Sequence, residues 1–369
     1  MRRAAGGLAL LSFVALFACG LDVVGTGPAL DGGPTPTPTP EDAGATLPEP
    51  GVPDAAGGGD ATIDPPVSEC GDVLTSENDC GACGHSCGGR GCTGGLCNRE
   101  PVAALTEPRA IAVGSDVFIA NPGVVQRFSL AGVRGSDMPS SSSNGSALTL
   151  TASRLVVGTN DTLAYYSLGG GSGDSATTER IRDVVASSTQ LFYSRDPGEV
   201  RRNNHNLTSA STISTANSDP FGLALDDNNL YWVDRTARTI VKAPLGGGGG
   251  PAAIVNGQDG LHSIATDATS LYWTTATEIR RSDKNGGGAT TLVTERRRPR
   301  SLVHDQGFLY WIDGDSGRLE RAPTTGGTPL VLAQDAALPA NVSARLVAVT
   351  ATHVYWASPS DGRVSRLPK

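Results

Sequence analysis

Four tripeptides recur in the second half of this chain: Leu230-Tyr231-Trp232, Leu271-Tyr272-Trp273, Leu309-Tyr310-Trp311 and Val354-Tyr355-Trp356. They contain all four tryptophans of the 369 residues, and each follows an aliphatic patch and a short turn. Weaker copies of the same phrase start at Val117, Leu155 and Leu191, so that seven copies begin 36 to 45 residues apart. A repeat of about 40 residues made of short strands is typical of a β-propeller, with one four-stranded blade per copy.

The copy over residues 262–293 illustrates the four strands that we expect in each blade. We assign residues 262–267 to the inner strand, 270–275 to the second, 278–282 to the third and 289–293 to the outer strand. The segment 284–288, Lys-Asn-Gly-Gly-Gly, favours a hairpin turn because asparagine and glycine tolerate positive φ. Similar glycine runs elsewhere lack the Lys-Ser/Thr ending of a phosphate-binding loop, so we interpret them as turns.

The last copy lacks an outer strand, whereas an unassigned strand precedes the first copy. Residues 101–105 match the phase of an outer strand, and we expect them to complete the blade formed by residues 344–367. Closure of this kind removes exposed sheet edges. The predicted fold class is therefore all-β, a seven-bladed β-propeller closed by an N-terminal strand. Six blades are the alternative if one early copy does not form a blade.

The paired aromatic residues predict how the blades pack. Adjacent residues of a strand point to opposite faces of the sheet, and in a propeller both faces of a blade contact a neighbouring blade. We therefore expect the tyrosine and tryptophan of each tripeptide to fill the space between blades. Stacking of the tryptophans against carbohydrate is the alternative role for these rings.

Residues 1–18 have the features of a signal peptide. Arg2 and Arg3 form a basic start, and the apolar run that follows is too short to span a bilayer as a stable helix. The ending Leu16-Phe17-Ala18-Cys19 resembles a bacterial lipobox, in which the cysteine is lipidated. We therefore predict a lipoprotein, anchored through Cys19 to a membrane of the bacterial cell envelope and exposed to the periplasm or the cell surface. An ordinary secretory signal with an incidental cysteine is the alternative.

Residues 19–68 are predicted to be a disordered tether. They include an alternating Pro-Thr run over residues 34–40 and have few apolar side chains to bury. Much of the formal net charge of −8 lies at this end of the chain, since residues 1–66 contain eight acids and two arginines. Residues 99–369, the predicted propeller, contain 26 basic and 25 acidic side chains. Such a balanced domain gives no electrostatic reason to expect nucleic-acid binding.

Six cysteines cluster within residues 69–98, which we assign to a separate small module: Cys70, Cys80, Cys83, Cys87, Cys92 and Cys97. An even number of cysteines in a short, glycine-rich, secreted segment favours disulfides, and fifteen pairings are possible. A zinc site is the alternative, because Cys80 and Cys83 have metal-ligand spacing and His85 lies close by. We expect a spacer or cap function for this module, with a separate binding function left open.

The tetrapeptides that begin with each Tyr-Trp pair resemble the YWTD repeats of low-density-lipoprotein-receptor-type propellers and of related bacterial repeats. The best matches are Tyr231-Trp232-Val233-Asp234 and Tyr310-Trp311-Ile312-Asp313, because only these two end in an acid. The resemblance is good over residues 221–367 and weak over residues 107–220. It implies a propeller fold, although the receptor propellers have six blades, and a receptor-like function would be an analogy only.

The position that precedes each inner strand predicts a ligand-binding rim at the mouth of the central channel. Four of the residues in this phase are cations or histidine, and Phe221 lies among them; the candidate rim consists of Arg182, Phe221, His262, Arg300 and Arg345. Clustered arginines are suited to an anionic ligand such as a sugar acid, a phosphate or an acidic peptide. The alternative is that these arginines form ion pairs with loop acids of the same face, namely Asp196, Asp234, Asp313, Asp315 and Asp361.

Metal and catalytic motifs are weak in this sequence. The segment 313–317 has oxygen ligands in a glycine-containing loop, which leaves calcium as an alternative to a protein without cofactors, although EF-hand spacing is absent. The predicted propeller has no cysteine, no metal-spaced histidines and no Gly-x-Ser-x-Gly motif, and we assign no catalytic or metal-binding residue.

The function that we predict is that of a monomeric binding protein, which presents one propeller face to a protein or glycan partner. An enzyme, such as a lyase, lactonase or hydrolase, is the alternative, and it would need His262 or His304 beside a metal in the channel.

Overall fold

The computed structural model describes residues 72–139, 146–169, 173–336, 338 and 345–369. All of them belong to the second of the chain's two compact units, which spans residues 63–369. The predictions of a signal peptide, of lipidated Cys19 and of a tether concern residues outside these ranges, and so does Cys70. Within the described ranges, no helix is long and apolar enough to cross a membrane.

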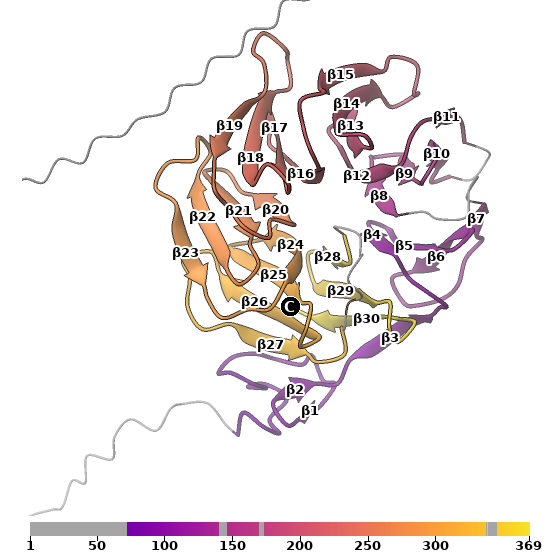
Figure 1. The fold of residues 1–369 in the computed structure, drawn as a ribbon. Helices are drawn as coiled ribbons and strands as arrows, with labels where there is room; N and C mark the ends of the chain where they lie inside the picture. Colours follow the sequence, from indigo (N-terminus) through magenta and orange to yellow (C-terminus); the bar gives the residue numbers. More distant parts are fainter. Residues whose placement is uncertain (1–71, 140–145, 170–172, 337, 339–344) are drawn as a thin grey trace, which may run out of the picture. The chain divides into compact units, whose positions relative to one another are not determined.

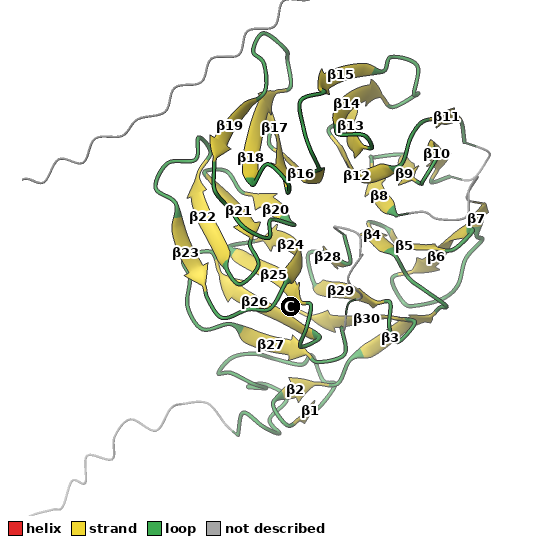
Figure 2. Cartoon of the chain, viewed as in Figure 1, coloured by secondary structure: helices red, strands yellow, loops and turns green. Residues whose placement is uncertain are grey.

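Seven four-stranded antiparallel sheets form a ring of blades, which we number in chain order (Figures 1 and 2). Blade 1 consists of β4 (Ala110–Val113), β5 (Asp116–Asn121), β6 (Val124–Ser129) and β7 (Met138–Pro139). Blade 2 consists of β8 (Ala147–Leu150), β9 (Arg154–Gly158), β10 (Thr162–Ser167) and β11 (Ser175–Thr177). Blade 3 consists of β12 (Ile181–Ala186), β13 (Gln190–Arg195), β14 (Glu199–Asn204) and β15 (Ser211–Ser214). In each, the first strand along the chain lies innermost.

The next three blades contain the sharpest copies of the repeat. Blade 4 consists of β16 (Pro220–Leu225), β17 (Asn229–Asp234), β18 (Thr239–Pro244) and β19 (Ala252–Val255). Blade 5 consists of β20 (Ile264–Thr266), β21 (Ser270–Thr274), β22 (Ile279–Asp283) and β23 (Thr290–Val293). Blade 6 consists of β24 (Pro299–Asp305), β25 (Phe308–Asp313), β26 (Arg318–Pro323) and β27 (Leu330–Ala333). The four strands expected over residues 262–293 are therefore confirmed, with the inner strand beginning two residues later than predicted.

The seventh blade joins the two ends of the propeller. Its strands are β28 (Val347–Val349), β29 (His353–Ser358), β30 (Arg363–Pro368) and, as the outer strand, β3 (Glu100–Ala104). The register places Glu100 opposite Arg366 and Ala104 opposite Arg363. The prediction of seven blades closed by an N-terminal strand is confirmed, and the six-bladed alternative is wrong.

The aromatic tripeptides fill the interfaces between blades, as predicted. All four tryptophans and the four tyrosines beside them are at most 1% exposed. Trp232 packs with Val185 and Phe192 of blade 3, whereas the adjacent Tyr231 packs with Leu271 and Trp273 of blade 5. One strand therefore supplies the filling on both sides of its blade. The alternative in which the tryptophans stack against carbohydrate is ruled out, because no ring face is accessible.

A tyrosine–aspartate hydrogen bond accompanies this packing in blades 4 and 5. The hydroxyl of Tyr231 donates to Asp226 at 2.9 Å, and that of Tyr272 donates to Asp267 at 2.7 Å. Each aspartate lies five residues earlier, in the turn between the first and second strands. Burial acts to raise the pKa of Asp226, but hydrogen bonds from Lys284, from backbone amides and from Tyr231 outweigh it and lower this pKa to about 2.

A second recurrent contact links the third strand to the aromatic residue of the second. Arginine lies opposite the aromatic ring in five blades, in the cross-strand pairs Phe118–Arg127, Phe192–Arg202, Tyr272–Arg281, Tyr310–Arg321 and Tyr355–Arg366. Three of these arginines also reach the next blade, since their guanidinium groups donate to the carbonyl oxygens of Leu168, Leu245 and Leu130. The last contact runs from blade 7 to blade 1, and it adds a side-chain link to the strand pairing that closes the ring.

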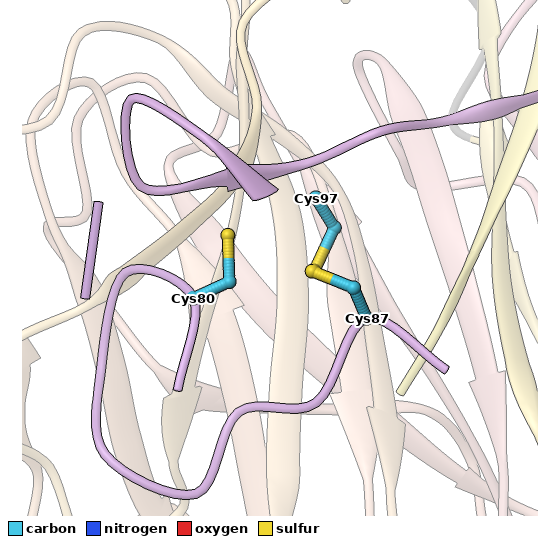
Figure 3. Close-up of side chains that lie close together, drawn as sticks. All are labelled: Cys80, Cys87 and Cys97. Atoms are coloured by element: carbon cyan, nitrogen blue, oxygen red, sulfur yellow. A yellow bond between two sulfur atoms is a disulfide. The ribbon is translucent and has the colours of Figure 1, made fainter. Parts of the chain in front are cut away.

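The cysteine module is a small disulfide-bonded unit that packs against blades 6 and 7, with its hairpin next to β27 and β3 (Figure 1). Figure 3 shows its Cys87–Cys97 disulfide beside Cys80. Its hairpin of β1 (Cys92–Thr93) and β2 (Leu96–Cys97) is joined to the preceding loop by the disulfides Cys80–Cys92 and Cys87–Cys97. Cys83 is also disulfide-bonded. The sulfurs of Cys80, Cys87 and Cys97 lie within 4.8 Å of one another, but their engagement in disulfides rules out the zinc alternative.

The module continues directly into the closing strand. Cys80, Cys87 and Cys97 share one apolar cluster with Leu332 of blade 6 and Val364 of blade 7. Glu100, the first residue of β3, forms ion pairs with Arg90 of the module at 2.5 Å and with Arg366 at 2.7 Å. This packing fits the predicted cap function, since the module holds β3 in place from its N-terminal side.

We predict that β3 contributes strongly to the stability of the whole ring. Val102 is 6% exposed, so Val102→Asp places a charged group in the apolar cluster and should lower the free energy of unfolding by about 3 kcal/mol or more. Ala104→Asp in the same strand is the control, because Ala104 is exposed and should tolerate the change. Urea unfolding measures both, and equal stabilities of the two variants would contradict this function of β3.

The low pKa of Asp226 predicts acid-sensitive stability. A carboxyl whose pKa is lower in the folded than in the unfolded protein stabilises the fold above its unfolded-state value, here 3.8, and loses this contribution as the pH falls toward 2. Asp226→Asn should therefore be less stable than wild type at neutral pH and should converge with it near pH 2. Thermal unfolding between pH 2 and pH 6 measures this, with Asp227→Asn as the control for loss of a neighbouring charge.

Candidate functional site

The candidate rim lies where the inner strands begin, at one end of the ring. Arg182, Phe221 and Arg300 belong to β12, β16 and β24, and His262 and Arg345 come just before β20 and β28. At this end the chain enters each blade, and the loops between second and third strands lie at the same end because the strands are antiparallel. All five residues therefore lie at the start of the inner strands, the end of the blade at which the sequence repeat had put them. Their surroundings differ, and Phe221 and His262 are in direct contact.

The inner strands carry β-bulges at this position. The register shifts between Ile181 and Asp183, between Phe221 and Leu223, and between Arg300 and Val303. A bulge bends the strand and re-aims the side chain next to it, which is how Arg182 and Arg300 leave the plane of their blades. At Gly222 the bulge has φ of 49°, and a Cβ there would lie 2.6 Å from the carbonyl oxygen of His262. Only glycine allows this close approach of blades 4 and 5.

Arg345 crosses the centre of the ring. Its Nε and Nη2 atoms donate to the two carboxylate oxygens of Asp183 at 2.8 and 3.2 Å, and Nη2 also donates to the carbonyl oxygen of Leu223 at 2.8 Å. Asp183 is 1% exposed and also accepts the backbone amide of Leu223 at 2.7 Å. These contacts join blade 7 to blades 3 and 4. The two hydrogen bonds of the ion pair give the Arg345 side chain a structural role at the centre of the ring.

A chain of serine hydroxyls continues this network around the centre. The Ser263 hydroxyl oxygen accepts the backbone amide of Ser301 at 2.9 Å, and that of Ser301 accepts the amide of Leu346 at 3.1 Å. Blades 5, 6 and 7 are linked in this way, and in blade 6 the amide of Ser301 lies within the bulge of the inner strand. Polar groups at the centre therefore satisfy one another and fix the relative positions of the inner strands.

Arg182 and Arg235 share an acidic partner on the mouth face. Arg182 Nε donates to Asp196 at 2.8 Å and its Nη2 lies 4.0 Å from Asp219. Arg235 contacts both carboxylate oxygens of Asp219, at 2.8 and 3.0 Å. The alternative of ion pairs with loop acids is thus correct for Arg182. For Arg345 the partner was wrong, since the acid is Asp183 of an inner strand.

Two of the loop acids have a different function. Asp234 accepts the backbone amides of Ser218 and Asp219, and Asp313 accepts the amide of Arg297 together with the amide and hydroxyl of Ser316. These are the terminal acids of the two best tetrapeptides, and they hold the loop that enters their own blade. A calcium ion in the 313–317 loop would have to displace the donors to Asp313.

Arg300 stands apart from the other rim cations. It has no hydrogen-bonding or ion-pair partner among the described residues, and its Nε atom is buried. Burial lowers its pKa to about 10, with Arg235 adding to this effect and Asp315 opposing it. Asp315 is itself paired with Arg298. Two guanidinium groups are therefore held near one another, and only that of Arg235 is neutralised by contact with a carboxylate.

Phe221 and His262 form the apolar support beneath Arg235. The guanidinium carbon of Arg235 lies 4.3 Å from the Phe221 ring centre, and Phe221 packs edge-on against His262 with 4.7 Å between ring centres. Both rings are at most 4% exposed. They support Arg235 from one side and are not themselves open to a ligand. His304, the other histidine of the enzyme alternative, stacks on Tyr272 instead, so the two histidines do not converge.

Sequence reasoning missed Asp183 and Arg235. Asp183 was detectable as an acid within the apolar inner-strand pattern Ile181–Ala186, where a buried charge requires a partner. Arg235 directly follows the tetrapeptide 231–234, but nothing in its sequence position indicates that it folds back over Phe221.

Comparisons with known proteins agree with this architecture. No protein-family model matches the chain. Low-density lipoprotein receptor-related protein 5 from mouse is 28% identical over 174 residues, covering 44% of this chain, and the human protein is 28% identical over 175 residues. The propeller is YWTD-like. The chain spans only about a tenth of the length of these relatives, at 10% of each.

Solved structures show the same fold at low identity. Virginiamycin B lyase from Staphylococcus aureus has a TM-score of 0.62 at 13% identity, covering 74% of this chain and 99% of the lyase. A catalytically inactive variant of that lyase with quinupristin has a TM-score of 0.63 at 11% identity, covering 74% of this chain and 98% of the variant. At this level of identity the likeness concerns the fold alone.

We predict that the Arg345–Asp183 ion pair stabilises the centre of the ring. Arg345→Ala leaves the buried carboxylate of Asp183 without its cation, and should lower the free energy of unfolding by about 2–3 kcal/mol. The double variant Arg345→Ala/Asp183→Asn should recover part of this loss, because no uncompensated charge remains. Chemical denaturation of Arg345→Ala, of Asp183→Asn and of the double variant measures the effect. A double variant that loses more stability than the two single variants together would contradict the prediction.

Proposed function

We propose that this protein is a lipid-anchored, extracytoplasmic binding protein that presents its channel-mouth face to an anionic group of a protein or glycan partner. One observation supports this proposal above the others: the guanidinium group of Arg300 at the mouth has a buried Nε atom and no partner within the described residues. A half-buried cation without a counter-ion is costly, and an oxyanion from a ligand would relieve that cost.

The other rim residues prepare this position. Asp219 holds Arg235 from one side and Phe221 supports it from below, so that the guanidinium is fixed before a ligand arrives. A preorganised cation loses little conformational entropy on binding, which favours affinity. The neighbouring acids Asp196, Asp219 and Asp315 repel a highly charged anion. A single carboxylate, as in an acidic side chain or a sugar acid, therefore suits the site best.

The location of the protein is part of the same proposal. A lipid on Cys19 would hold the chain at a membrane of the bacterial cell envelope, and residues 19–68 would provide distance from the lipid surface. The disulfides of the module agree with an oxidising compartment such as the periplasm or the cell surface. Metabolic labelling with a fatty acid, compared between wild type and Cys19→Ser, tests the anchor separately from ligand binding.

The binding proposal predicts that Arg300 decides the capture of anionic ligands. With polyglutamate and polygalacturonate as immobilised probes, Arg300→Ala should weaken capture of at least one probe about tenfold, and Arg300→Glu should weaken it further. Capture by wild type should fall as salt is added. The stability of Arg300→Ala should equal or exceed that of wild type, because the removed cation has no partner.

Arg238→Ala provides the matched control on the same face. Arg238 is half exposed and already paired with Asp259 at 2.6 Å, so its removal should leave capture nearly unchanged. Equal loss in the two alanine variants would indicate unspecific charge attraction. Undiminished capture by Arg300→Glu would refute the proposed binding position.

A further inference from the structure

A polar pocket of about 550 Å³ opens between blades 4 and 5, at the end of the ring opposite the mouth. Its walls come from the β16–β17 and β20–β21 turns, and from the β22–β23 turn. In an antiparallel blade these turns lie at the other end of the strands from the loops that carry Arg300 and Arg235. This volume is within the range of small-molecule binding sites, so the pocket is a candidate for ligand binding.

The side chain that borders the aromatic ring differs between this interface and the next one along the ring. In blade 5, Tyr272 is covered by the imidazole of His304, which stacks on it with ring centres 5.8 Å apart and an interplanar angle of 8°. The residue in the same phase opposite Tyr231 is Thr266, which has no ring to stack. The smaller side chain leaves open the space that an imidazole fills one blade further along.

Two lysines line this pocket, and one of them departs from the repeat. Lys242 lies opposite Tyr231 in the cross-strand position that is arginine in five other blades. Lys284 occupies a turn position that is leucine at residues 130, 168 and 245 but lysine again at residue 369, where Lys369 pairs with Asp305 as Lys284 pairs with Asp226. Lys284 donates to Asp226 at 2.8 Å, and Lys242 donates to the side-chain oxygen of Asn285 at 2.9 Å. The Lys284–Asp226 pair therefore belongs to the packing between blades, whereas lysine at position 242 is particular to blade 4.

The charges in the wall are already engaged with one another, which selects the class of ligand. A charged ligand would have to separate Lys284 from Asp226, whose pair also receives the hydroxyl of Tyr231 at 2.9 Å. A neutral ligand would leave this network intact. The carboxylate of Asp227 and the amide side chain of Asn228 have no partner among the described residues, and they offer free acceptors and donors at the edge of the pocket.

We propose that this pocket is a second binding site, specific for a neutral saccharide. Sugar hydroxyl groups both donate and accept hydrogen bonds, and so match a wall that mixes carboxylate, amide, ammonium and hydroxyl groups. The pocket is large enough for one or two hexose units and lacks the broad apolar lining of a hydrophobic-ligand site.

Filling the pocket tests the proposal. Thr266→His supplies the imidazole that blade 6 provides over Tyr272, and should fill the pocket without loss of thermal stability. Ligand-observed NMR of the full chain with glucose, galactose, N-acetylglucosamine and maltose as probes should show binding of at least one of them to wild type. Thr266→His should weaken that binding at least about tenfold. Thr266→Val, which keeps the volume of the side chain, should retain it.

The charged counterparts glucuronate and galacturonate separate this site from the one at the mouth. We expect them to bind the pocket more weakly than the neutral sugars, and Arg300→Glu should leave neutral-sugar binding unchanged. The proposal is overturned if none of the four neutral sugars binds, if Thr266→His binds them as well as wild type, or if the uronic acids bind the pocket more tightly. None of these outcomes bears on anion capture at Arg300.

Discussion

Closure of the ring depends on the pairing of β3 with β30. Every other strand pair of the propeller joins neighbours in sequence, through hairpin turns of a few residues. Only this pair brings together the beginning and the end of the domain, and it gives the last blade its outer strand. The cysteine module lies immediately before β3, and its disulfides and its apolar contacts with blades 6 and 7 keep that strand in register. A mechanical force applied to the N-terminal side of the chain would therefore act on the module before it acted on the propeller.

The packing between blades follows from one feature of the β-strand. Because adjacent side chains point to opposite faces, a single Tyr-Trp pair fills two interfaces at once. Each buried ring contributes roughly 4–6 kcal/mol of gross hydrophobic stabilisation, before the entropy of ordering is subtracted. In blade 4 the polar ends of these rings also find partners: Tyr231 donates to Asp226, and the indole nitrogen of Trp232 donates to Asn217. The buried indole nitrogen of Trp311 in blade 6 has no partner among the described residues, so the repeat specifies the apolar filling more strictly than its hydrogen bonds.

The candidate sites are places where this repetition is incomplete. At the mouth, bulges in the inner strands turn arginines away from their sheets, and most of them meet a carboxylate, whereas Arg300 does not. At the opposite end, Thr266 leaves open a space that His304 fills one blade further along, and Lys242 stands where five other blades have arginine. In both positions the fold tolerates the change because the aromatic pairs beside it carry the packing.

The all-β class, the seven blades, the strand that closes the ring and the preference for disulfides in the cysteine module could all be predicted from the sequence. Each of these depends on contacts within about 40 residues, or on a repeated pattern that counts the blades. The phase of the repeat also placed Arg182, Arg300 and Arg345 at the beginnings of inner strands. The contacts of those side chains could not be predicted and are known from the folded ring. Asp183 and Arg345 are 162 residues apart and meet across the centre of the ring. Strand periodicity fixes which end of a blade a residue occupies, but the partner across the ring depends on how seven twisted sheets close.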